Sequence, residues 1–241
     1  MSDNTTGRHT MRAYADELKQ LHTIVLEMSE RVRTQIRDAV NSLEHESPDE
    51  AWLVFEAEKR VNELDTSADD QIIHIIAKRQ PVARDLREIL AVSKIVGDLE
   101  RIGDLACRVA RLTTTFYEGE HLAPSAQMRR DVPHLAHFVD EMIDTATRAY
   151  DTLDLTLALQ VIERNEVLEQ EFKAALRRIS TYILEDSRNV GCAADLVLGL
   201  RALERIGGHA RNISRHVVFL VKGRDVRHKG REAIAAELFT S

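Results

Sequence analysis

The pentapeptide Leu-Glu-Arg-Ile-Gly occurs twice in this chain, at residues 99–103 and again at residues 203–207. Each copy lies within a long helical pattern, and each is followed at the same distance by an alanine, Ala106 or Ala210. An identical string that recurs in matching surroundings indicates an internal repeat. We therefore predict that the chain contains two copies of one helical unit.

The apolar residues between Met11 and Glu46 recur every three or four positions, as on the buried face of a long helix. Ser47 and Pro48 then supply a capping hydroxyl and a proline at the first position of a second helix. Gly191 is expected to break the chain before the last helix. The same signals predict five further helices, at about residues 48–79, 81–116, 128–152, 155–185 and 192–222.

The predicted fold is all-α, with two tandem three-helix bundles built from these six long helices. The short connections place neighbouring helices side by side and antiparallel. The expected organisation is a flexible N-terminus, a first repeat, a linker, a second repeat and a polar, loosely held C-terminal tail. Their ranges are 1–10, 11–117, 118–127, 128–222 and 223–241.

Composition excludes several classes of protein. The formal net charge of −7 argues against a dedicated nucleic-acid binder. No apolar run approaches the roughly 20 residues of a membrane span, and the polar start does not resemble a signal peptide. Cys107 and Cys192 lack metal-ligand spacing and are expected to be buried thiols in a reducing cytosol. No phosphate-binding glycine loop or nucleophile elbow is present, so we expect no enzyme.

Acidic side chains four residues apart lie off the apolar stripes of the first repeat. Glu100 and Asp104 would stand one above the other, and Glu58 and Asn62 share a helix flank. Stacked oxygen ligands from two adjacent helices can hold Mg²⁺, Mn²⁺ or iron. The alternative is ordinary solvated surface, with the acids paired to arginines such as Arg101.

The second repeat carries the corresponding faces. Glu204 and Gly208 lie where Glu100 and Asp104 lie in the first repeat, and Asn165 and Glu169 share a flank of the preceding helix. The last helix is locally basic, which would suit an acidic partner, although a solvated face is the simpler interpretation. The candidate partner-binding residues are Arg101, Arg201, Arg205 and Arg211.

Short sequence runs in both halves point to a family. In the first half these are Lys-Arg-Gln-Pro at 78–81, Ala-Arg-Asp-Leu-Arg at 83–87 and the run 99–104. In the second half they are residues 185–188, 203–207, 212–213 and 221–223. Taken together and in this order, these runs resemble the PhoU family of phosphate-transport accessory proteins. The resemblance extends from about residue 11 to residue 228.

The resemblance implies two three-helix bundles related by a pseudo-twofold axis, in a cytoplasmic, non-enzymatic protein that is often a homodimer. PhoU proteins are negative regulators of the phosphate-starvation response and restrain phosphate uptake. They are understood to join the phosphate transporter to its sensor histidine kinase. The implied partners are therefore the transporter ATPase subunit and the kinase, with no nucleic acid and with a membrane only through these partners.

The resemblance also implies a metal site, because some family members hold metal clusters on acid-x-x-x-acid motifs. In the first repeat, Glu100 with Asp104 keeps this pattern and Glu58 with Asn62 is a variant of it. We expect this site to take iron, manganese, magnesium or zinc.

The second-repeat site is expected to be weak or absent. Asn165 replaces an acid, Glu169 and Glu204 keep theirs, and Gly208 supplies no ligand. Two other interpretations of the whole chain stay open: a metal-dependent enzyme or metal-storage protein using the Glu100 and Asp104 face, and a plain helical scaffold.

Overall fold

The computed structural model describes residues 3–82, 84–119, 123–226, 229–230 and 236. Within these residues the chain forms six long helices, two single-turn helices and no strand, which confirms the predicted fold class. The long helices are α1 (Asp3–Glu44), α2 (Pro48–Arg79), α3 (Arg84–Tyr117), α5 (Asp131–Thr152), α6 (Leu155–Glu185) and α7 (Val190–Lys222). The short ones are α4 (Ala126–Arg129) and the 3₁₀ turn η1 (Ser187–Asn189).

Two helix starts follow the capping signals of the sequence. The Ser47 hydroxyl accepts a hydrogen bond from the backbone N–H of Glu50, and Pro48 opens α2. The Asp154 carboxylate accepts hydrogen bonds from the backbone N–H groups of Thr156 and Leu157 at the start of α6. Both caps satisfy N–H groups that a helix leaves without an internal partner.

Three predicted boundaries were wrong. Helix α1 begins at Asp3, so residues 3–10, expected to be a flexible end, continue the helix. Gly191 does not break the chain, because η1 turns it earlier and α7 already begins at Val190. The end of the predicted linker is also helical, since Ser125 caps the single turn of α4.

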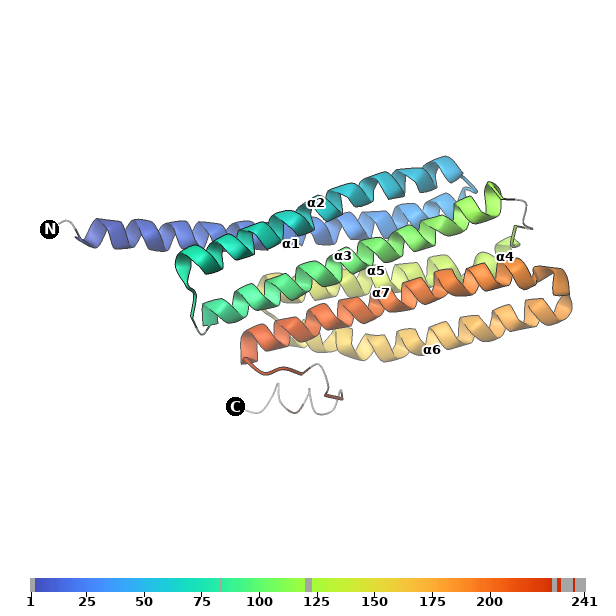
Figure 1. Cartoon of the computed structure of the whole chain (residues 1–241). Coiled ribbons are helices and arrows are strands. Elements are labelled where there is room, and N and C mark those ends of the chain that lie inside the picture. Colours follow the sequence, from blue (N-terminus) through green and yellow to red (C-terminus); the bar gives the residue numbers. More distant parts are fainter. Residues whose placement is uncertain (1–2, 83, 120–122, 227–228, 231–235, 237–241) are drawn as a thin grey trace.

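The helices form two bundles that pack against each other. Helices α1, α2 and α3 form the first bundle and α5, α6 and α7 the second (Figure 1). Helices α3 and α7 run side by side in opposite directions and make the main seam between the bundles, with α1 against α5 as a second contact. Leu99 and Leu203 of the repeated pentapeptide are buried, at 1% and 0% exposure, so the repeat contributes to the core of each bundle.

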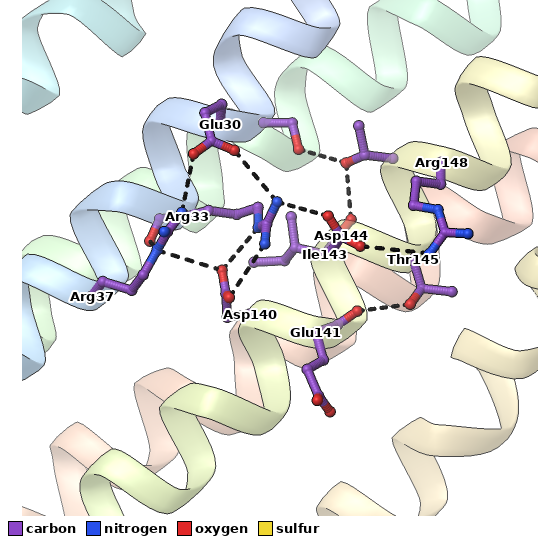
Figure 2. A network of polar contacts seen from close by, with 11 residues as sticks. Glu30, Arg33, Arg37, Asp140, Glu141, Ile143, Asp144, Thr145 and Arg148 are labelled. Atoms are coloured by element: carbon purple, nitrogen blue, oxygen red, sulfur yellow. Dashed lines mark hydrogen bonds and ion pairs between the residues drawn. The ribbon is translucent and has the colours of Figure 1, made fainter.

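A polar network ties α1 to α5 across the two repeats (Figure 2). The Arg33 Nε atom donates to Asp140 Oδ1 at 2.8 Å, and Nη1 donates to Asp144 Oδ1 at 2.7 Å. Glu30 pairs with Arg33 and Arg37 at the edge of the network. Because the Arg33 and Asp140 side chains are only 20% and 16% exposed, removing either would leave a largely buried charge without its partner.

The beginning of the C-terminal tail is packed, contrary to the predicted loosely held segment from residue 223. Gly223 ends α7 with a φ of 72°, the left-handed conformation that glycine adopts without penalty. A side chain at this position would collide with the Arg87 guanidinium. Val226, three residues later, is fully buried. Most of the remaining tail lies outside the described residues.

None of the helices in the described part of the chain has both the length and the apolar character needed to span a membrane.

Candidate functional site

The carboxylate of Glu58 lies between α2 and α3, inside the first bundle. The sequence placed Glu58 on a helix flank, but its exposure is only 8%. The Gln35 amide Nε2 from α1 donates to Glu58 Oε2 at 2.7 Å. On the α3 side, a Cβ atom at Gly103 would stand 2.6 Å from Oε2. The glycine of the repeated pentapeptide therefore makes room for this carboxylate.

This environment makes Glu58 a weaker acid than an ordinary glutamate, because it raises the pKa of the side chain. Burial raises the pKa of Glu58 to about 7, the hydrogen bond from Gln35 opposes the rise, and the charges of Asp104 and Glu100 add to it. The Oε1 atom is buried and has no hydrogen-bond partner within the described residues. The Cys107 thiol lies 3.9 Å from Glu58 Oε2, and burial raises the pKa of Cys107 to about 12, so this thiol is inert at neutral pH.

Glu100 and Asp104 lie on the more open face of α3, and one arginine pairs with both. The Arg101 Nε atom is 3.3 Å from Glu100 Oε2, and Nη1 is 3.3 Å from Asp104 Oδ2. Burial and then the Asp104 charge raise the pKa of Glu100. Because the Arg101 side chain is 61% exposed, solvent screens these pairs and we expect little stabilisation from them.

The structure brings only some of the predicted metal donors close to one another. Glu58, Glu100 and Asp104 are close enough to perturb one another electrostatically, whereas Asn62 is exposed. Across the residues described, no group of three or more histidine, cysteine or acidic side chains is placed to hold a metal ion. Glu58 Oε1 has spare coordination capacity, but a cation shared by the three acids would have to displace Arg101 and the Glu58 proton.

The second repeat replaces this acid with an amide. Asn165 is buried, and its Nδ2 atom donates to Glu169 Oε1 at 2.9 Å. Gly207, the counterpart of Gly103, makes room for the apolar Leu168 side chain. Glu204 pairs with Arg201 at 3.3 Å. The second repeat therefore presents fewer acidic groups at the corresponding place.

A polar cluster that the sequence analysis missed lies in the seam between α3 and α7. The Asp98 carboxylate, 12% exposed, is 2.8 Å from His209 Nδ1 and 3.2 Å from His216 Nε2. The Asn212 amide also donates to Asp98, at 3.4 Å. Burial by itself would raise the pKa of Asp98, but the hydrogen bonds from the histidines outweigh it and lower the pKa. The available signal was the spacing of seven between the histidines, which puts them on one helix face.

The four candidate partner-binding arginines do not form one patch. Arg201 and Arg205 line a groove of about 380 Å³ between α3 and α7, together with Arg108 and Arg111. Arg101 pairs with the acids of the first repeat instead. Arg211 is only partly exposed and lies 3.9 Å from Glu169.

The fold and the site together define a class of protein in which a three-helix bundle is duplicated. In one of the two bundles, a buried acid lies beside the glycine of the repeated pentapeptide. The PhoU domain model matches residues 25–113 and 132–217, which covers both repeats. The chain belongs to the PhoU family.

Named relatives match over nearly the whole chain. The phosphate-specific transport system accessory protein PhoU homolog of Pseudomonas putida is 38% identical over 230 residues, covering 95% of this chain and 89% of the relative. The accessory protein PhoU of Escherichia coli K12 is 30% identical over 230 residues, covering 95% and 94%.

Solved structures agree with the fold. The crystal structure of PhoU from Pseudomonas aeruginosa has a TM-score of 0.82 at 37% identity, covering 88% of this chain and 100% of that one. The regulatory protein PhoU from Streptococcus pneumoniae has a TM-score of 0.78 at 19% identity, covering 88% and 99%, which speaks for the fold alone.

Proposed function

We propose that this chain is a regulatory accessory protein of phosphate transport that works as a cytoplasmic, homodimeric adaptor. In this role it contacts the ATPase subunit of the phosphate transporter and the sensor histidine kinase, and it represses the phosphate-starvation response when phosphate is plentiful. The observation that carries the proposal is the family match over both repeats, together with relatives named as transport accessory proteins. A regulator of this kind needs only a partner whose two states bind it differently.

The site geometry supports an adaptor better than a metal-dependent enzyme. A catalytic metal needs an open coordination position in a pocket that excludes water. Asp104 instead lies on an open helix face, 42% exposed and paired with Arg101. The inward acid, Glu58, has its Oε2 atom against Gly103, 2.6 Å from where a Cβ atom would stand.

We also propose that a hard cation modulates the adaptor by binding Glu100 and Asp104, with Glu58 Oε1 as a further donor. The unpartnered buried Oε1 atom supports this proposal. Iron, manganese or magnesium would suit such an oxygen donor set, and zinc would suit it less well. The cation would replace Arg101 as the partner of the two outer acids.

The adaptor proposal is tested by deleting the gene and by measuring binding with purified proteins. Deletion should switch on phosphate-starvation genes in phosphate-rich medium, and the purified chain should bind the ATPase subunit or the cytoplasmic part of the kinase. Normal repression after deletion, together with no binding to either protein, would overturn the proposal. Hydrolysis of p-nitrophenyl phosphate that disappears in Glu100→Gln would favour the enzyme instead.

A further inference from the structure

The groove between the end of α3 and the start of α7 has an apolar floor. Leu105, Leu112 and Ala202 line it and are buried. A Cβ atom at Gly199 would collide with the Leu112 side chain, so the glycine lets α3 pack directly onto the α7 backbone here. The floor is therefore formed by two closely packed helices.

The rim of this groove is basic. Arg108, Arg111, Arg201 and Arg205 are all exposed and line the groove with a single acid, Asp195. Two of the four are held by other groups of the chain. The Arg111 guanidinium lies over the Phe55 ring at 5.6 Å, and Arg201 lies over Phe172 at 5.6 Å while pairing with Glu204.

The other two rim arginines are available to an external anion. Among the described residues, the side chains of Arg108 and Arg205 make no hydrogen bond and no ion pair. Leu198, on the same rim, is 67% exposed. The groove therefore offers unpaired positive charge beside an exposed leucine and an apolar floor.

The internal repeat shows that this groove is a specific feature of one end of the seam. Equivalent positions in α3 and α7 are 104 residues apart, as Leu99 and Leu203 are. Asp98 therefore corresponds to the floor residue Ala202, and its partners His209 and His216 correspond to Leu105 and Leu112. At one end of the seam a polar cluster therefore occupies the positions that form the apolar floor at the other end.

Two further positions distinguish the groove from the corresponding place at the other end of the seam. Thr115, which lines the groove, corresponds to Phe219 at the other end, and the exposed Leu198 corresponds to Lys94. Lys94 Nζ lies over the Phe219 ring at 5.4 Å. An aromatic ring covered by a lysine thus occupies the position at which the groove has a small hydroxyl side chain and an exposed leucine.

We propose that this groove binds an acidic amphipathic helix of a protein partner. Such a helix would place apolar side chains, three or four residues apart, on Leu198 and the floor, and its carboxylates against Arg108 and Arg205. The formal net charge of the chain is −7, so a rim with four arginines differs from the surface as a whole and would direct an acidic segment to this place. The inference rests on the proposed adaptor function and assigns it a docking surface.

The test uses the full chain with the purified ATPase subunit and with the cytoplasmic part of the kinase. Binding is measured by calorimetry for the wild type, for Arg108→Glu/Arg205→Glu and for Leu198→Gln. The matched control is Lys19→Glu, an exposed charge in the N-terminal half of α1. Circular dichroism checks that every variant folds, which we expect because the substituted side chains are exposed.

The expected result is that both groove variants weaken the Kd for one partner at least tenfold, while the control stays within about twofold. Added salt should weaken binding of the wild type more than that of the arginine variant. Unchanged binding in both groove variants would overturn the docking surface and leave the adaptor role intact. No binding of the wild type to either protein, together with normal repression after gene deletion, would overturn the adaptor role itself.

Two further measurements test whether the groove binds something other than a partner helix, namely a second copy of the chain or inorganic phosphate. Sedimentation of the chain alone would reveal a self-association that the arginine variant abolishes. In that case the groove receives a second copy, and the proposal fails. Titration with inorganic phosphate that depends on both arginines, without any effect on partner binding, would equally overturn the proposal.

Discussion

The Glu58 carboxylate occupies the space in which a side chain at Gly103 would begin, because a Cβ atom there would stand 2.6 Å from Oε2. The repeated pentapeptide thus keeps its glycine in both bundles for a steric reason, although the neighbour differs. In the first repeat the glycine accommodates a buried acid, and in the second it accommodates Leu168. Conservation of the glycine between repeats therefore does not require that the acid be kept as well.

Substituting alanine for Gly103 should destabilise the protein by about 1–3 kcal/mol, because the new methyl group overpacks the Glu58 carboxylate. The matched control is Gly208→Ala, where a Cβ atom meets nothing within 4 Å. That substitution should stabilise the helix by about 0.5–1 kcal/mol. Urea unfolding measures both, and a Gly103→Ala protein as stable as the wild type would contradict the packing argument.

Replacing Glu58 with glutamine should make the protein more stable at alkaline pH. The folded-state pKa is raised to about 7 from an ordinary value of 4.5, so the folded chain holds a proton that the unfolded chain releases. The resulting stability is complete below about pH 4.5 and is lost as the pH rises through about 7.

The measurement is the free energy of unfolding of both proteins at pH 5 and pH 8. Relative to the wild type, Glu58→Gln should gain about 1–3 kcal/mol between these pH values. The second repeat, with Asn165 in the corresponding place, already has an amide there. A difference between the two proteins that does not change with pH would show that Glu58 is ionised throughout.

Removing the Asp98 carboxylate should weaken the seam between the repeats. Asp98→Ala leaves His209 and His216 without their shared partner and should cost about 3 kcal/mol at neutral pH. The control Asp195→Ala, at the groove, should change stability by less than about 0.5 kcal/mol. Equal effects of the two substitutions would contradict a special role for Asp98.

The loss of stability caused by Asp98→Ala should depend on pH. The pKa of Asp98 is lowered in the folded state, so its stabilisation is present above the ordinary value of 3.8 and is lost as the pH falls through the lower folded value. Urea unfolding at pH 3 and pH 6 should therefore show a smaller difference between wild type and Asp98→Ala at pH 3.

Metal content separates the cation proposal from ordinary ion pairing. Protein purified without a nickel column should contain about one metal ion per chain by mass spectrometry, and Glu100→Gln/Asp104→Asn should lose it. Glu204→Gln in the second repeat is the control and should change nothing. Arg101→Ala should bind the metal more tightly, because it removes the competing cation. A metal-free wild type that folds normally would leave the acids as ion-pair partners of Arg101.

The fold could be predicted from sequence because its signals are local. The Ser47 and Asp154 caps and the apolar stripe of α1 depend on residues within a few turns of one another. Gly191 was misread because its effect depends on η1, which turns the chain before it. The packed start of the tail was missed because a single valine, Val226, gives no periodic signal.

The candidate site was harder to predict, because its features depend on neighbouring helices. Glu58 lies at the edge of the apolar stripe of its own helix, and only Gln35 from α1 and Gly103 from α3 show that it is buried. The Asp98 cluster pairs residues more than a hundred positions apart. The sequence of a single helix determines neither the angle between α3 and α7 nor the contacts between their side chains.

The difference between the two ends of the α3 and α7 seam has a consequence for assembly. A duplicated chain with identical ends would offer two equal docking places and could cross-link its partners into open networks. Here Asp98 and its histidines occupy the positions that correspond to the apolar floor of the groove beside Arg108 and Arg205. Each copy of the chain would therefore offer the proposed partner helix a single groove of this kind, which favours complexes of fixed size.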